Sequence, residues 1–149
     1  MNAAIILQTY LDEIAAAVMA GDFAAYQAGV VLPFHLVTHT ANVAITGEDG
    51  LRDGFESFRT MLQTQRVTDY IRLVESAQAL DPELITGRYV THLIAGGMRV
   101  LDPFHSQITL RHVEGRWRAA SITNALANSR WPFLISQIGT TAPPKGPEE

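Results

Sequence analysis

The hydrophobic positions near the start of the chain recur at helical spacing. One stripe, at intervals of four, three and four residues, consists of Leu7, Leu11, Ile14 and Val18. Gly21 follows at the point where such a helix would end, and glycine readily adopts the left-handed conformation that closes a helix. The pattern therefore predicts a first helix over residues 3–19.

Two further helices are indicated in the first half of the chain. Asp22 is suited to be the N-cap of a short helix from Phe23 to about Gly29. Residues 46–49, Thr-Gly-Glu-Asp, have the form of a capping box that opens a longer helix ending near Gln65. The apolar stripe of this longer helix consists of Leu51, Phe55, Phe58 and Leu62.

The stretch 84–127 is rich in residues typical of strands and contains three long runs. Two turn signals, Gly96-Gly97 and Glu114-Gly115, divide the runs. Consecutive runs with short turns predict an antiparallel meander. Within the middle run, Asp102-Pro103 predicts a bulge or an edge, because proline cannot donate a ladder hydrogen bond.

Two earlier segments are also expected to be strands. Residues 67–80 form one, with Tyr70, Arg72 and Val74 on one face. The other, residues 34–40, is placed after Pro33, since proline is unfavourable inside a central strand. Its two faces are Phe34, Leu36 and Thr38 against His35, Val37 and His39, and either face could point inward.

The order helix, helix, strand, helix and then four strands is typical of the α+β class. We expect a cone-shaped, strongly bent antiparallel sheet wrapped around the N-terminal helices, with an open mouth. One domain over residues 1–139 accounts for these elements, and the tail 140–149 lacks an apolar pattern, so we expect it to be disordered. An apolar segment that begins at Trp131 follows the last strand and must dock on the domain or on a second subunit.

Composition narrows the classes of function. The net charge of −4 and the lack of a basic run argue against nucleic acid. The absence of cysteine excludes disulfides and thiolate chemistry within this sequence. The apolar N-terminus carries Asp12 and Glu13 in its middle, so we expect neither a signal peptide nor a membrane span, and we expect a cytoplasmic protein.

Three short motifs give the chain a resemblance to a known superfamily. They are Tyr10–Phe23, a helix closing on Gly-Asp; Gly47–Phe55, which contains Gly-x-x-x-Leu-Arg; and Glu114–Arg118, which contains Gly-x-Trp. In this order and at these intervals the sequence resembles the nuclear transport factor 2-like superfamily over residues 3 to about 126. That superfamily includes ketosteroid isomerase-like and SnoaL-like polyketide-cyclase-like proteins, and its members include enzymes, binding modules and partner-binding domains.

The resemblance implies positions for enzymatic residues. Ketosteroid isomerase-like enzymes use a base near the end of the first strand, a tyrosine from the first helix and a protonated aspartate from a later strand. The tyrosine position falls at Ile14, with Tyr10 one turn away. The base position falls at about Thr38 or His39, and the acid position falls near Ser106. These residue types depart from the isomerase pattern, and His39 is the nearest remaining base.

Histidine is suited to acid–base chemistry near neutral pH. His39, with His92 or His105 on neighbouring strands, could form a pair of the isomerase or dehydratase kind. Alternatively, the five histidines are ordinary residues of exposed or half-buried strands. Their spacing does not favour a metal site, and we expect neither a metal nor another cofactor.

Aromatic and polar side chains of the predicted elements could line a pocket within the cone, or the aromatic ones could be plain core. Of the arginines on strands, Arg88 is the strongest candidate to bind an anionic group, because Val90 and His92 share its face. The residues expected at the pocket are Tyr10, Ile14, Tyr26, Phe34, Arg88, His92, Phe104, Ser106, Trp117 and Trp131.

Two functions remain open at this stage. One is a cofactor-free isomerase, dehydratase or cyclase of the SnoaL-like group with His39 as base. The other is a non-catalytic, homodimeric domain that binds a ligand or a protein partner. Both readings imply an apolar or carboxylated small molecule or a partner protein, and the resemblance implies dimerisation through the sheet.

Overall fold

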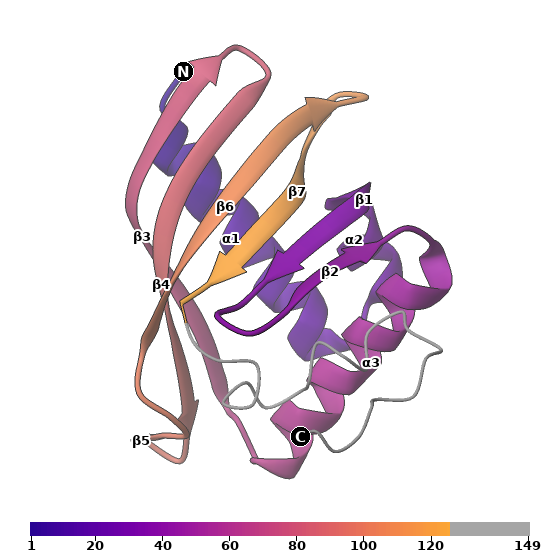
Figure 1. The fold of residues 1–149 in the computed structure, drawn as a ribbon. Coiled ribbons are helices and arrows are strands. Elements are labelled where there is room, and N and C mark those ends of the chain that lie inside the picture. Colours follow the sequence, from indigo (N-terminus) through magenta and orange to yellow (C-terminus); the bar gives the residue numbers. More distant parts are fainter. Residues whose placement is uncertain (126–149) are drawn as a thin grey trace.

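The computed structural model describes residues 1–125. Three helices are present in this range: α1 (Ala3–Ala20), α2 (Phe23–Ala28) and α3 (Glu48–Thr64). The strands of the same range, drawn in Figure 1, are β1 (Val30–Val37), β2 (Asn42–Ile45), β3 (Asp69–Asp81), β4 (Leu84–Ala95), β5 (Met98–Arg99), β6 (Phe104–Val113) and β7 (Arg116–Asn124).

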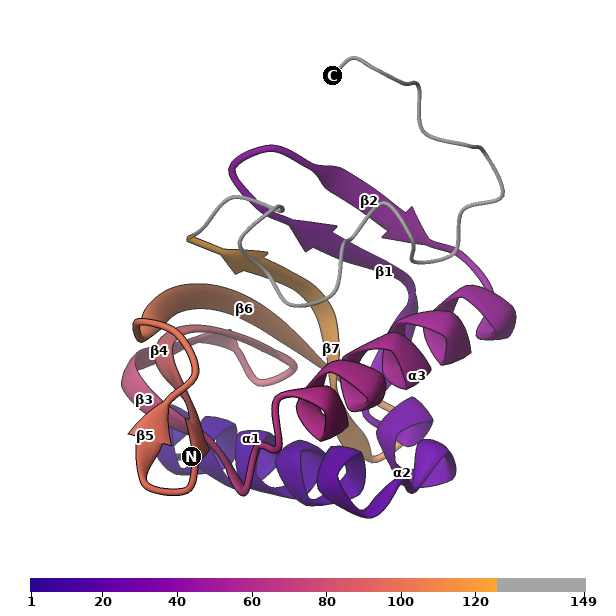
Figure 2. The ribbon, with the colours of Figure 1, turned by 90° about the horizontal axis from the view of Figure 1, so that it is seen from below.

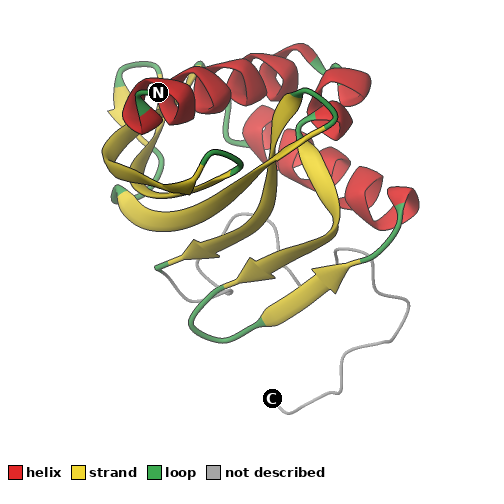
Figure 3. Ribbon diagram, turned by 90° about the horizontal axis from the view of Figure 1, so that it is seen from above, coloured by secondary structure: helices red, strands yellow, loops and turns green. Residues whose placement is uncertain are grey.

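All strands belong to one sheet, in the order β2-β1-β7-β6-β4-β3, and the short β5 pairs with β4. Neighbouring strands are antiparallel except for β1 and β7, which run parallel. The sheet curls strongly, and the three helices lie on its concave side (Figures 2 and 3). The predicted α+β cone is therefore confirmed, with one parallel strand pair that the sequence did not indicate.

The core lies between the concave face of the sheet and the apolar stripes of α1 and α3. Strand β4 illustrates how the pattern produces this, since its alternate residues from Ile85 to Leu93 are buried. Both predicted helical stripes are buried against the sheet. The largest fully buried side chains are Leu7, Leu11, Leu51, Ile85, Leu93, Ile108 and Leu110.

Local signals at the ends of α1 and α2 act as expected. Gly21 ends α1 at φ 76°, in the left-handed region. The Asp22 carboxylate accepts a hydrogen bond from the backbone N–H of Ala25 and caps α2. Helix α1 is long and apolar enough to span a membrane by length and composition, yet its Leu7 and Leu11 are fully buried in the core.

Three local predictions are corrected. Strand β1 begins at Val30 and includes Pro33, whose exposed ring lies where the pairing with β7 shifts register, so no ladder bond is lost there. The N-cap of α3 is Gly47, which offers no capping side chain, rather than Thr46. Asp102-Pro103 precedes β6 instead of lying within a strand.

Residues 126–149 lie outside the described part of the chain. The predicted domain boundary at residue 139, the tail 140–149 and the apolar segment at Trp131 fall there and stay predictions.

Candidate functional site

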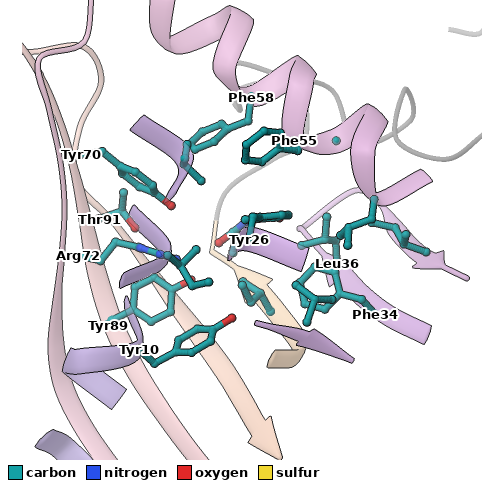
Figure 4. Close-up of a pocket in the computed structure, with 18 of the residues that line it drawn as sticks. Tyr10, Tyr26, Phe34, Leu36, Phe55, Phe58, Tyr70, Arg72, Tyr89 and Thr91 are labelled. Carbon is teal, nitrogen blue, oxygen red and sulfur yellow. The ribbon is translucent and has the colours of Figure 1, made fainter. Parts of the chain in front are cut away.

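A cavity of about 80 Å³ lies inside the cone, between the concave face of the sheet and the helices (Figure 4). Its walls come from all three helices and from β1, β2, β3, β4, β6 and β7. Most of the wall is aromatic or aliphatic. The polar and charged residues among those that line it are Tyr10, Tyr26, Tyr70, Arg72, Tyr89, Thr91 and Asn124.

Half of the residues expected at the pocket do line it. Tyr10 and Ile14 reach it from α1, Tyr26 from α2, Phe34 from β1 and Phe104 from β6. Aromatic residues are efficient pocket walls because each ring covers a large apolar area. Phe55 and Phe58 of α3 complete the apolar side, and Phe55 packs with its ring centroid 4.9 Å from that of Tyr26.

All four tyrosines of the sequence line this cavity. Burial raises the pKa of Tyr26 to about 12, and burial also raises the pKa of Tyr10 and Tyr70 well above the ordinary value. The Tyr10 hydroxyl donates a hydrogen bond of 2.8 Å to the Gly29 carbonyl, which ties α1 to the start of β1. The hydroxyls of Tyr10, Tyr26 and Tyr70 are therefore neutral hydrogen-bonding groups at physiological pH.

Arg72 is the charged residue of the pocket wall. It is only 5% exposed, and its guanidinium lies over the rings of Tyr70 and Tyr89, 4.9 and 5.5 Å from their centroids. One terminal nitrogen, Nη2, donates a 3.2 Å hydrogen bond to the Leu11 carbonyl. The Nε atom is buried and has no hydrogen-bond partner. Figure 4 shows the guanidinium directed from β3 into the cavity.

The backbone around Arg72 is held by strand β4 on one edge of β3 and by helix α1 on the other. Thr91 of β4 is its partner in the sheet register, so the two side chains share the concave face. From α1, the Gln8 side chain donates to the Arg72 carbonyl at 2.8 Å and accepts from the Val74 N–H at 2.9 Å. Gln8 thus clamps α1 to β3 beside the arginine and satisfies backbone groups that would otherwise be unpaired.

Two influences act in opposite directions on the pKa of Arg72. Burial lowers it, while Tyr70, Tyr89 and Tyr10 raise it, and the net shift is upward. Because arginine is effectively always protonated, Arg72 is a permanent positive charge. Burial raises the pKa of Tyr10 and of Tyr70, so both stay neutral and leave this charge unbalanced near neutrality.

Ser106 is buried behind the cavity wall rather than in it. Its hydroxyl donates a short 2.6 Å hydrogen bond to the side-chain oxygen of Asn124, which does line the cavity. Ser106 therefore orients Asn124, and the Asn124 amide nitrogen is the group that remains for a further partner.

His39 does not line the cavity, and its expected position is corrected. The residue is exposed in the bend after β1, whereas Thr38 beside it is buried. Phe34 and Leu36 belong to the cavity wall, so the face of Phe34, Leu36 and Thr38 is the inner one. Because strand side chains alternate, the face that carries the histidines points outward.

Arg88 and His92 are also absent from the cavity wall. Both lie on alternate positions of β4 that point to the outer face. Arg88 faces Glu75 at 3.9 Å, and the same carboxylate contacts His105 at 3.0 Å. A guanidinium nitrogen of Arg99 lies 3.5 Å from His92. These side chains form a polar network on the convex surface.

Trp117 lies outside the cone cavity. Its ring packs at an inclination of 59° against that of His112, with the centroids 4.9 Å apart. Trp117 also borders a separate depression at the N-terminal half of α1, together with Ile5, Thr9, Glu13 and Arg116. Tyr10 contributes to both this depression and the cone cavity.

Trp131 falls beyond the described residues. Within residues 1–125, no cluster of His, Cys, Asp or Glu has the arrangement of a metal site.

Sequence reasoning missed Arg72, Tyr70 and Thr91 as site residues. The available signal was the alternation in residues 70–74, which places Arg72 between Tyr70 and Val74 on one face. A charged residue on an otherwise apolar face is informative, because burial of an unpaired charge is unfavourable. The sequence alone did not say which face points inward.

No family model and no curated protein matches this sequence. Solved structures do match its fold. A nuclear transport factor 2-like protein of unknown function from Shewanella oneidensis MR-1 aligns with a TM-score of 0.63 at 11% identity, over 80% of this chain and 95% of that chain. A protein of unknown function with a cystatin-like fold from Nostoc punctiforme aligns with a TM-score of 0.61 at 15% identity, over 84% and 91%.

A third similar structure is a nuclear transport factor 2-like protein with a cystatin-like fold from Novosphingobium aromaticivorans. Its TM-score is 0.59 at 16% identity, over 83% of this chain and 80% of that chain. The chain therefore shares the α+β fold of these nuclear transport factor 2-like and cystatin-like structures, which is the fold that the resemblance of the three motifs implied. At these identities the likeness concerns the fold, and function has to be argued from the cavity.

Proposed function

We propose that this protein is a small-molecule-binding domain whose ligand occupies the cone cavity. The observation that carries the proposal is that the cone is not packed solid. Its aromatic walls enclose about 80 Å³, and a few polar groups converge on that space. Apolar walls with a few fixed polar groups are typical of ligand sites.

Binding without proton transfer is favoured over the isomerase, dehydratase or cyclase alternative. Among the described residues that line the cavity there is no histidine, aspartate or glutamate. The groups that could act on a bound molecule are tyrosine hydroxyls of raised pKa and a permanently charged arginine. Neither is a general base near neutral pH.

The proposal is tested by a fragment screen with ligand-observed NMR, in which hits are located through the methyl signals of Ile14 and Ile122 in the cavity wall. Leu36→Phe fills the cavity from β1, and we expect it to abolish binding. Leu32→Phe is the matched control, since Leu32 is 37% exposed on the same strand and does not line the cavity.

Small aromatic fragments that perturb these methyl signals in the wild type and in Leu32→Phe, but not in Leu36→Phe, would support the proposal. A screen in which no fragment perturbs them would contradict it.

We further propose that the domain forms a homodimer through the convex face of the sheet. Ile71 and Leu73 are 38% and 48% exposed on this face of β3, and within residues 1–125 the helices lie on the opposite, concave side of the sheet (Figure 3). Exposed apolar side chains on an open sheet are typical of association surfaces. A monomeric mass in light scattering at micromolar concentration would contradict the dimer.

A further inference from the structure

The Arg72 guanidinium is a buried charge for which the described part of the chain supplies no counter-charge. The ion pairs found in residues 1–125 join Arg52 with Glu48, Arg88 and His105 with Glu75, and Arg118 with Glu114. Arg72 takes part in none of them. The cavity wall described here contains no carboxylate and no second cation.

Such an arrangement is costly for a protein to maintain for structural reasons alone. A buried charge is normally paired and fully hydrogen-bonded, because it loses its hydration on burial. Arg72 has partial compensation from the faces of Tyr70 and Tyr89, from the Leu11 carbonyl and from a hydrogen bond with the Tyr89 side chain. The buried Nε–H still lacks an acceptor, and the positive charge is not neutralised.

The groups around Arg72 are suited to complete the binding of an anion. The hydroxyls of Tyr26 and Tyr70 turn toward the same space as the guanidinium (Figure 4). Because their pKa values are raised by burial, these hydroxyls stay protonated and can donate hydrogen bonds. Phe55 and Phe58 pack beside these tyrosines, with ring centroids 4.9 Å from Tyr26 and 5.2 Å from Tyr70 respectively, and they extend the apolar wall for the remainder of a ligand.

We propose that the cavity takes a small organic monocarboxylate, with its carboxylate on Arg72 and its apolar body against the aromatic wall. This inference rests on the proposed function and names the chemical class of its ligand. One guanidinium balances one negative charge, so a carboxylate fits better than a phosphate dianion, which would leave a net charge among apolar rings. A cavity of about 80 Å³ favours a small molecule.

The test is a pair of isosteric probes, benzoate and benzamide, with butyrate and butyramide as a slimmer pair, measured by calorimetry and by protein NMR. We expect a carboxylate to bind the wild type at least tenfold more tightly than its amide. Arg72→Met should abolish this preference, and Arg72→Lys should reduce it, because lysine keeps the charge without the planar Nε–H donor. Arg88→Met is the matched control and should retain the preference, since that side chain is exposed on the outer face.

The outcomes separate the two proposals. Equal affinities of amide and carboxylate for the wild type would overturn the monocarboxylate inference and leave the binding function intact. Binding of neither member of either pair would overturn both. The wild-type comparison requires no variant to fold, and the amide spectrum of each variant checks its fold independently.

Discussion

Arg72 and Arg88 lie on neighbouring strands of one sheet and have opposite environments. Arg72 points into the cone, is 5% exposed and has no carboxylate partner among the described residues. Arg88 points outward, has a side chain that is 54% exposed and faces Glu75. The face of the strand, rather than the residue type, therefore decides whether an arginine is a candidate ligand-binding group or an ordinary surface charge.

The same contrast extends to the two faces of the sheet. The concave face carries the core, the tyrosines and the cavity, while the convex face carries exposed histidines, arginines and a few apolar side chains. Matched substitutions on the two faces test this difference.

The largest difference is expected for leucine truncation. Leu93→Ala on the concave face removes a side chain that is 1% exposed, and it should lower the free energy of unfolding by about 2–5 kcal/mol. Leu73→Ala on the convex face removes one that is 48% exposed in the single chain, and the loss should stay below about 1 kcal/mol at protein concentrations low enough to keep the chain monomeric. Urea denaturation of both variants measures the difference, and similar losses would contradict the assignment of the faces.

The next effect is a dependence of stability on alkaline pH. The folded-state pKa of Tyr26 is raised to about 12, so the folded chain keeps this proton while the unfolded chain releases it from pH 10 upward. The contribution of Tyr26 to the free energy of unfolding is therefore fully present below pH 10. On the order of 2 kcal/mol of this contribution is lost as the pH rises from 10 to 12. Tyr10 and Tyr70 act in the same direction.

Urea denaturation at a series of pH values checks this prediction, and Tyr26→Phe is the control that should flatten part of the slope. Because every tyrosine of the chain lines the cavity, tyrosinate absorbance reports on this site alone. Tyrosine ionisation near the ordinary pKa in the folded protein would show that the cavity is open to water.

A smaller effect, with the opposite sign to that of most core substitutions, is expected at Arg72. Replacement of an unpaired buried charge by an apolar side chain of similar shape relieves its desolvation. In the absence of ligand, Arg72→Met should raise the free energy of unfolding by roughly 1–2 kcal/mol, and Arg88→Met should change it by less than about 0.5 kcal/mol. A loss of several kcal/mol in Arg72→Met would mean that the arginine stabilises the fold rather than a ligand.

The smallest effect concerns the convex network around Glu75. Its contacts with His105 and Arg88 are exposed, and exposed ion pairs contribute little because water and salt screen them. Glu75→Gln should lower the free energy of unfolding by less than about 0.5 kcal/mol, and the effect should vanish at high salt. A larger, salt-independent loss in urea denaturation would indicate that this network is buried in an assembly.

Hydrophobic periodicity predicted most of the fold, whereas only five of the nineteen residues that line the cavity were expected there. The stripes of α1 and α3 and the three runs after residue 84 were sufficient for the cone, because each has one apolar face that must be covered. Of the five cavity residues, Tyr10 and Ile14 were expected at the site from the resemblance to ketosteroid isomerase-like enzymes, and Tyr26, Phe34 and Phe104 were expected there as aromatic residues.

The remaining site residues depended on which face of a strand points inward. In β1 both faces are of mixed polarity, so a choice between His39 and Thr38 required the register with β7, which comes from tertiary pairing. Arg88 shares a face with Val90 and His92 and was expected inward for that reason, although Tyr89 and Thr91 prove to be the buried ones. Arg72 was missed because charged residues are ordinarily exposed.

The anion site at Arg72 is tested most directly by the NMR signal of its Nε–H group during titration with benzoate. This hydrogen has no acceptor in the ligand-free structure, so a carboxylate on it should shift the resonance strongly downfield and slow its exchange with water. We expect a saturable shift of the Arg72 Nε–H resonance with benzoate and little change with benzamide. A resonance unaffected by either molecule, in a protein that binds them elsewhere, would contradict an anion site at Arg72.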